Sequence, residues 1–89
     1  MTTVWVFNGV RDHFPSGVFS QREFAEAWIR KYQLTGTLTA YPIDQGVYDW
    51  AIEYGHFKQK REEHNTPSFI GNFNSPSQEN YHYQDGALY

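Results

Sequence analysis

The chain contains no cysteine among its 89 residues, which excludes disulfide bonds and thiolate metal sites. Proteins of the reducing cytoplasm lack disulfides, so this composition leads us to expect a cytoplasmic protein. The N-terminal sequence MTTVWVFNG has no basic stretch followed by a long apolar run, and we therefore predict no signal peptide. No apolar run approaches the ~20 residues that span a bilayer, so no membrane partner is expected.

A basic excess is also missing, because the formal net charge is −3. Nucleic-acid binders neutralise phosphates with a basic face, so the overall charge argues against a nucleic-acid partner. The local exception is Lys58, Lys60 and Arg61 within FKQKREEH, residues 57–64. Glu62 and Glu63 follow at once and nearly cancel the charge, so we interpret this segment as a solvated loop.

The sequence carries none of the short catalytic patterns GxGxxG, P-loop, GxSxG or CxxC. The four histidines, His13, His56, His64 and His82, are scattered without the spacing of zinc ligands. Asp49 and Glu53 stand four residues apart on a predicted helix, where a solvated face explains them. We therefore expect a non-catalytic protein with no metal and no cofactor, and an enzyme with an unrecognised constellation is the alternative.

Aromatic residues are abundant, at 19% of the chain. Large rings supply much of the burial in a small core, yet Tyr48, Tyr54, Tyr81 and Tyr83 cannot all be assigned to a core from the pattern. Exposed Tyr and Trp are typical anchors of protein interfaces. A half-buried core position with the hydroxyl reaching water is the competing interpretation for each of these residues.

The stretch from Gly17 to Asp44 predicts a strand, an amphipathic helix, a turn and a second strand. Ser20 and Glu23 have the spacing of a capping box, and Phe19 and Phe24 have that of a hydrophobic staple. Spacings of three and four residues place one group of side chains on a single buried stripe: Phe24, Ala25, Trp28, Ile29 and Tyr32. We also expect an ion pair between Glu26 and Arg30, and Gly36 in the turn after the helix.

The predicted fold is α+β, an antiparallel sheet of three to four strands with two helices packed mainly on one face. The strands are expected at 2–8, 17–19, 37–41 and 80–83, with 2–8 central and 17–19 antiparallel to it; the helices are expected at about 20–32 and 46–54. Asp44 is the predicted cap of the second helix, and Gly55 follows its end. Thr66-Pro67 predicts a helix start, although 67–73 also suits a strand. We expect a single domain over 1–89 with a loose tail at 84–89.

Seven segments resemble a small bacterial domain family without assigned function: VWVFNG (4–9), FPSGVFS (14–20), AEAWI (25–29), LTGTLTAYPID (34–44), VYDWAIEYG (47–55), SFIGNF (68–73) and SQENYHYQDG (77–86). They cover most of the chain. The resemblance implies a bacterial cytosolic protein that occurs alone or as an appended module, sometimes beside immunity-type proteins. It transfers no catalytic residue.

The leading functional hypothesis is a non-catalytic protein-interaction module, with an immunity-type protein as one form of it. The alternative is a small-ligand or enzymatic site between the second helix and the C-terminal strand, built from Tyr48, Asp49, Tyr81 and His82. The partner protein stays unidentified, and sheet edges and exposed rings would also permit a homodimer.

Overall fold

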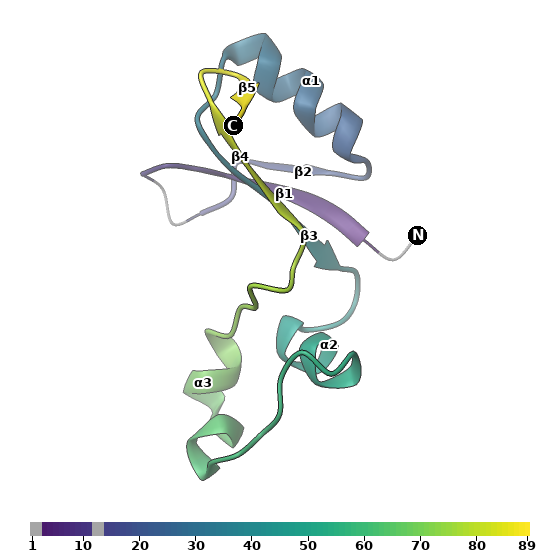
Figure 1. Ribbon diagram of the computed structural model, residues 1–89, viewed down its shortest axis with the longest axis vertical. Coiled ribbons are helices and arrows are strands. Elements are labelled where there is room, and N and C mark those ends of the chain that lie inside the picture. Colours follow the sequence, from purple (N-terminus) through teal and green to yellow (C-terminus); the bar gives the residue numbers. More distant parts are fainter. Residues whose placement is uncertain (1–2, 12–13) are drawn as a thin grey trace. The chain divides into compact units, whose positions relative to one another are not determined.

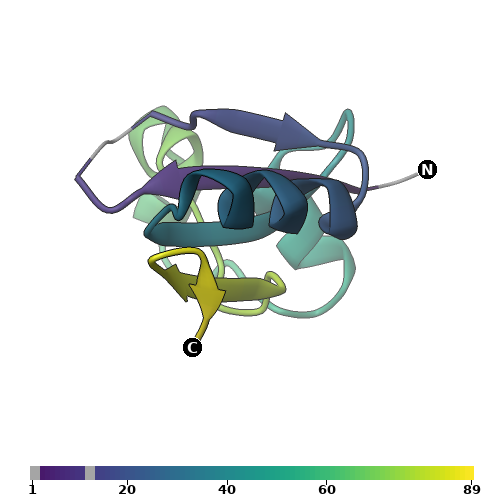
Figure 2. The same cartoon turned by 90° about the horizontal axis from the view of Figure 1, so that it is seen from above.

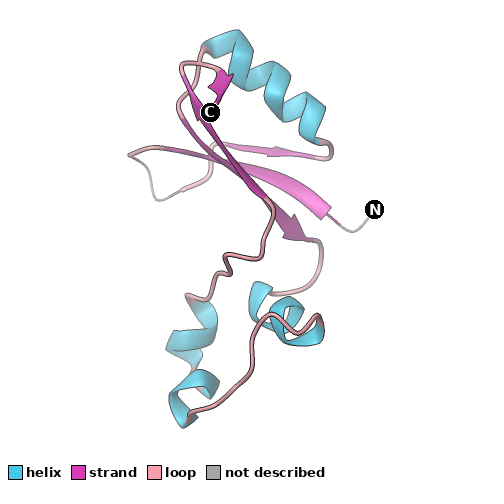
Figure 3. Ribbon diagram, in the orientation of Figure 1, coloured by secondary structure: helices cyan, strands magenta, loops and turns pink. Residues whose placement is uncertain are grey.

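The computed structural model describes residues 3–11 and 14–89. Two compact units make up this part of the chain: the described residues up to Ile43 with Gln78–Tyr89, and the segment Asp44–Ser77. Each unit is described by itself below. A single domain over residues 1–89 stays a prediction. The fold class is α+β, as predicted, and residues 3–11 and 14–89 form five strands and three α-helices instead of three to four strands and two helices (Figure 3).

The first unit contains one antiparallel sheet with the strand order β2-β1-β3-β4-β5 (Figure 1). Its strands are β1 (Thr3–Gly9), β2 (Gly17–Phe19), β3 (Gly36–Pro42), β4 (Asn80–Gln84) and β5 (Ala87–Leu88). The predicted central position of the first strand is confirmed, because β1 pairs with β2 on one side and β3 on the other. Thr2, which was included in that prediction, lies outside the described residues.

Helix α1 (Arg22–Tyr32) covers one face of this sheet (Figure 2). Strand residues alternate between faces, and the alternation places Phe7, Leu38 and Tyr83 toward the helix. These three side chains are buried together with Ala25 and Ile29 of α1 and form the core of the unit. The other face of the same strands carries Val4, Val6, Thr37, Thr39 and His82.

The predicted start of α1 is wrong in its details. The N-cap is Gln21, no side chain caps the helix, and the first helical residue is Arg22. Ser20 therefore lies one residue too early for its hydroxyl to reach the backbone N–H of Glu23 as a capping box requires. The predicted staple fails for the same reason, and Phe24 is 56% exposed.

The buried stripe of α1 is narrower than predicted. Ala25 and Ile29 are fully buried and Trp28 is half-buried, while Phe24 and Tyr32 are exposed. The predicted pair of Glu26 with Arg30 is replaced by an ion pair of Glu26 with Arg22, at 3.2 Å.

The chain leaves α1 through Gln33, which has a left-handed backbone with φ 53°. The N–H of Gln33 donates to the Arg30 carbonyl, and the N–H of Leu34 donates to the Ile29 carbonyl at 2.9 Å. This is the Schellman pattern, which usually has glycine at the left-handed position. The prediction that Gly36 supplies this turn is therefore wrong.

Gly36 instead begins β3, where it is buried and pairs with Gly9 on one side and Tyr83 on the other. A Cβ at this position would lie 2.2 Å from the Asn8 carbonyl oxygen and 2.7 Å from the Phe7 ring. The close approach of β1 to β3 therefore requires glycine at residue 36.

The C-terminal residues, predicted as a loose tail, contain strand β5, which pairs with β4. The two strands are joined by Asp85 and Gly86, whose φ angles of 51° and 86° are both positive. Such a two-residue Asp-Gly loop is typical of a type I′ hairpin. The turn is also held by the Gly86 N–H, which donates to the Leu34 carbonyl at 2.9 Å.

The second unit contains α2 (Val47–Glu53), the 3₁₀ helix η1 (Glu62–Asn65) and α3 (Pro67–Gly71) (Figure 3). The N-cap of α2 is Gly46, so the predicted cap Asp44 is wrong. Gly55 follows the end of α2 as predicted, with φ 76°. That α2 packs on the same sheet face as α1 stays a prediction.

Two sequence assignments in the second unit are decided by the structure. Thr66 caps α3 by accepting the Phe69 N–H at 3.2 Å, and Pro67 is the first helical residue, so residues 67–71 form a helix instead of a strand. The segment expected to be a solvated loop contains η1, and its Phe57 ring contacts Phe69 and Phe73.

The close approach at Gly36 makes the sheet sensitive to one methyl group. We expect Gly36→Ala to lower the free energy of unfolding by about 1–3 kcal/mol or more, because the new Cβ meets backbone atoms that cannot rotate away. Chemical denaturation would measure the change. Gly9→Ala is the matched control, since a Cβ there meets nothing within 4 Å; an equal loss in both variants would contradict this reason.

The left-handed conformation of Gln33 predicts a stabilising substitution. An L-residue pays roughly 1–2 kcal/mol in this region, and glycine does not, although it loses more chain entropy on folding. We expect Gln33→Gly to raise the free energy of unfolding by about 0.5–1 kcal/mol. Gln84→Gly, within β4, should lower it. A drop in the melting temperature of the Gln33 variant would contradict the strain assigned to residue 33.

Candidate functional site

The four residues predicted to form a site belong to two different units. Tyr81 and His82 are neighbours on β4 of the first unit, and Tyr48 and Asp49 are neighbours on α2 of the second. Tyr81 faces α1, and His82 points to the opposite side of the sheet. A common site for all four residues stays a prediction.

Tyr48 occupies the centre of the second unit, with only 7% of its surface exposed. Its ring contacts those of Phe57, Phe69 and Phe73. Its hydroxyl donates to the His64 carbonyl at 2.8 Å and accepts from Gln59 Nε2 at 2.7 Å. These contacts give Tyr48 a structural role, because a buried hydroxyl with two partners stabilises the surrounding rings.

Asp49 and His82 are the exposed members of the predicted set. The His82 ring shares a hydrogen bond with the Thr37 hydroxyl, with 3.2 Å between Oγ1 and Nδ1. Among the described residues, no three histidine or acidic side chains lie close enough to hold a metal ion; His13 lies outside them.

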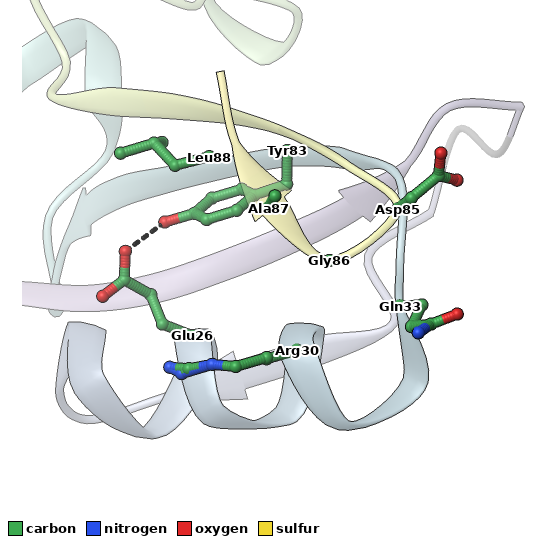
Figure 4. A pocket seen from close by; sticks show the side chains of 8 residues that line it. All are labelled: Glu26, Arg30, Gln33, Tyr83, Asp85, Gly86, Ala87 and Leu88. Carbon is green, nitrogen blue, oxygen red and sulfur yellow. Dashed lines mark hydrogen bonds between the residues drawn. The ribbon is translucent and has the colours of Figure 1, made fainter.

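A cavity of about 410 Å³ lies between α1 and the β4–β5 hairpin of the first unit (Figure 4). Helix α1 and the residue after it provide Glu26, Arg30 and Gln33. The remaining lining residues come from the hairpin: Tyr83, Asp85, Gly86, Ala87 and Leu88. Figure 4 shows Glu26 extending from α1 toward the Tyr83 hydroxyl at one end of this space. The cavity therefore has a polar end and an aliphatic wall at Ala87 and Leu88.

The polar end is organised by one carboxylate oxygen. Tyr83 donates its hydroxyl proton to Glu26 Oε2 at 2.6 Å, and Arg22 Nε donates to the same oxygen at 3.2 Å. The Arg22 guanidinium also lies 3.5 Å from the centre of the Tyr81 ring, in the geometry of a cation–π contact. Tyr81 in turn donates a hydrogen bond to Glu79.

Burial of the Tyr83 ring and the hydrogen bond to Glu26 raise the pKa of Tyr83 to about 12, against the lowering effect of Arg22. The phenol therefore stays protonated at neutral pH and acts as a hydrogen-bond donor. A general base works best with a pKa near the operating pH, and Tyr83 has been moved in the opposite direction. Within the network, Tyr83 therefore acts as a hydrogen-bond donor to Glu26 and not as a base.

An aromatic stripe, defined here as Phe24, Trp28 and Tyr32, lies beside the buried residues Ala25 and Ile29 on α1. Phe24 is 56% exposed and Tyr32 57% exposed, while Trp28 between them is half-buried. The Trp28 ring contacts Phe7, Phe19 and Tyr32 at centroid distances of 5.8, 5.5 and 6.3 Å. The middle ring of the stripe, Trp28, therefore packs against the core, and the rings on either side of it, Phe24 and Tyr32, lie at the surface.

The helical spacing predicted Phe24 and Tyr32 in the core, and this prediction is wrong because both rings are exposed. The neighbouring column, Ala25 and Ile29, takes the core position, because the small Ala25 side chain lets the helix approach the sheet. The sizes of the side chains could have indicated which residues of α1 are buried. The small residue Ala25 lies with Ile29 on the buried side, and the large rings lie beside them. Glu26 and Arg22 were also missed as partners of Tyr83, since they meet only across the helix–sheet contact.

The chain belongs to the family described as Domain of unknown function (DUF7710), which matches residues 4–89. This confirms the resemblance to a small domain family of unknown function; the bacterial origin stays a prediction. No curated protein and no solved structure matches the chain significantly. None of the described helices has the length and apolar character needed to cross a membrane.

The raised pKa of Tyr83 predicts a stability change at alkaline pH. Its contribution is fully present below pH ~10, the ordinary tyrosine value, and is lost as the pH rises toward 12. We expect Tyr83→Phe to reduce the loss of unfolding free energy between pH 9 and 12 by about 1–2 kcal/mol, less than the full linkage value because the cavity admits solvent. Tyr89→Phe, at an exposed residue, is the control; identical pH profiles for wild type and Tyr83→Phe would refute the prediction.

Proposed function

We propose that this member of the family of unknown function is a non-catalytic protein-interaction module that binds its partner through the aromatic stripe of α1. The observation that carries the proposal is the exposure of Phe24 and Tyr32 on either side of Trp28. Large rings on a rigid helix lose little conformational freedom on binding and bury much area, which is why aromatic residues are enriched among interface hot spots.

The surroundings of the stripe support a protein partner. Lys31 Nζ lies 5.1 Å from the centre of the Tyr32 ring, and Glu23 is exposed beside Phe24. An apolar centre with charged residues at its margin is the usual composition of a protein interface. Trp28, the middle ring of the stripe, is anchored by its contacts with Phe7 and Phe19, so its position does not depend on a partner.

The setting of this interaction is part of the same proposal. The bacterial, cytoplasmic setting and an immunity-type role for the module itself rest on the resemblance described above and on the lack of cysteine. A second copy of the chain is the other occupant that the stripe would accept, and light scattering distinguishes a homodimer from a monomer that awaits a different protein.

Small-ligand binding is the second candidate function, and the cavity beside Tyr83 favours it. Arg30 and Asp85 offer opposite charges at this cavity. The site first predicted for a ligand, with Tyr48, Asp49, Tyr81 and His82, is retained as the alternative location. Asp49 and His82 are each exposed, whereas Tyr48 is only 7% exposed and its hydroxyl already donates to the His64 carbonyl.

The interaction proposal is tested by substituting residues of the stripe and measuring which proteins the variant still binds. We expect Phe24→Asp with Tyr32→Asp to reduce recovery of a specific partner from native-host extract by about tenfold or more, because two anchors are replaced by charges. Quantitative mass spectrometry would compare this variant with the wild type, and circular dichroism would confirm that both are folded.

The matched control is Phe14→Asp with Tyr89→Asp, which removes two rings at least as exposed but outside the stripe. The control should retain the partner at the wild-type level. The proposal fails if no protein is depleted by the stripe substitutions, or if both double variants lose the same proteins equally.

A further inference from the structure

The second unit carries a cavity whose charge is opposite to that of the whole chain. Its volume is about 330 Å³, and its lining residues are Gly55, His56, Phe57, Lys58, Lys60 and His64. Two of the six are lysines, two are histidines and none is acidic. The formal charge of the whole chain is −3, so evenly spread charges would make an average surface region slightly acidic. This cavity is lined by basic side chains instead.

The backbone around the cavity is fixed at both ends. At the end of α2 the Gly55 N–H donates to the Ile52 carbonyl at 3.2 Å, and the His56 N–H donates to the Ala51 carbonyl at 2.7 Å. This Schellman motif depends on the positive φ of Gly55. At the other end, the Lys60 N–H donates to His64 Nδ1 at 3.0 Å. The two lysines therefore lie on a segment held by hydrogen bonds on either side.

Both imidazole rings are held by aromatic contacts. The His56 ring lies 5.0 Å from that of Trp50, and the His64 ring lies 4.8 Å from Phe69 and 5.1 Å from Phe57. Because Nδ1 of His64 accepts the Lys60 N–H, the neutral ring carries its proton on Nε2. The residues that line the cavity thus include an imidazole of defined tautomer and two lysines.

Two carboxylates of this unit are engaged with side chains other than the two lysines. Glu63 pairs with Arg61 at 3.2 Å, and Glu53 accepts from Gln45 Nε2 at 2.6 Å. Across the described part of the chain, neither Lys58 nor Lys60 forms an ion pair. Their charges are accordingly available to a ligand.

We propose that this cavity binds the phosphate group of a small anionic molecule. Ammonium groups and an imidazole N–H form charge-assisted hydrogen bonds with phosphate oxygens, which are stronger than neutral ones. A water occupies about 30 Å³, so the cavity holds the volume of several waters and accommodates a diphosphate. A long nucleic acid suits the chain less well, because the negative charge outside the cavity would repel its remaining phosphates.

Calorimetric titration of the full chain with inorganic pyrophosphate at low salt tests this site. We expect saturable binding with one site per chain, weakened about tenfold or more in Lys58→Gln/Lys60→Gln. Both lysines are exposed, so the double variant should keep its melting temperature. Absence of saturable binding to the wild type would overturn the proposal.

Arg61→Gln is the matched control, because Arg61 is a cation that directly follows Lys60 in the chain. It pairs with Glu63 and does not line the cavity. Its affinity for pyrophosphate should stay within about twofold of wild type. An equal loss in the control would show that binding follows overall charge and would overturn the site. So would tighter binding of a single-stranded oligonucleotide that pyrophosphate cannot displace, since a nucleic-acid surface would then explain the lysines.

Discussion

Ala25 and Ile29 hold α1 against the sheet, and the rest of the first unit follows from that contact. Both are fully buried against Phe7, Leu38 and Tyr83. Because alanine is small, the helix backbone approaches the strands closely at this point. The contact fixes the rotation of α1 about its axis, so the next column of side chains is directed toward the rim of the sheet and beyond it. The exposure of the aromatic stripe is a geometric consequence of how Ala25 packs.

The same rotation places the polar residues of α1 over β4. Glu26 follows Ala25 directly and therefore lies beside the buried column, where it meets the Tyr83 hydroxyl. Arg22, one turn earlier, reaches the same carboxylate and covers the Tyr81 ring. A buried tyrosine hydroxyl without a partner would lose its hydrogen bonds to water, so Glu26 allows the ring of Tyr83 to complete the core. The packing of Tyr83 in the core is therefore sufficient to explain the hydrogen-bond network, and the polar end of the cavity results from that network.

Much of the fold could be predicted from local sequence patterns. The alternation of apolar and polar residues identified β1, β3 and β4, and spacings of three and four residues identified α1. Thr66-Pro67 located the start of α3. The errors arose where a decision depends on residues distant in sequence. Gly36 is required by the carbonyl of Asn8 on the neighbouring strand, and no local pattern shows how closely these two strands approach each other there. The Asp85-Gly86 turn was a local hairpin signal that went unused, and β5 was missed with it. For the candidate sites, the sequence shows the chemistry of single residues but not which of them line the same cavity. Folding brings Glu26 and Tyr83 to one cavity, and Lys58 and His64 to the other.

The second unit shows how a short segment makes a core without a sheet. Its helices have seven and five residues, lengths at which isolated helices are marginal in water. Tyr48 compensates by connecting three parts of the segment, since its ring packs on Phe69 of α3 and its hydroxyl reaches the His64 carbonyl of η1 and the side chain of Gln59. Phe57 and His64 are drawn inward by the same rings. The charged residues between them, Lys58 and Lys60 to Glu63, remain exposed, because charged side chains are costly to bury in a core of aromatic rings. A single buried tyrosine thus accounts for both the order of this segment and the gathering of its lysines at one surface.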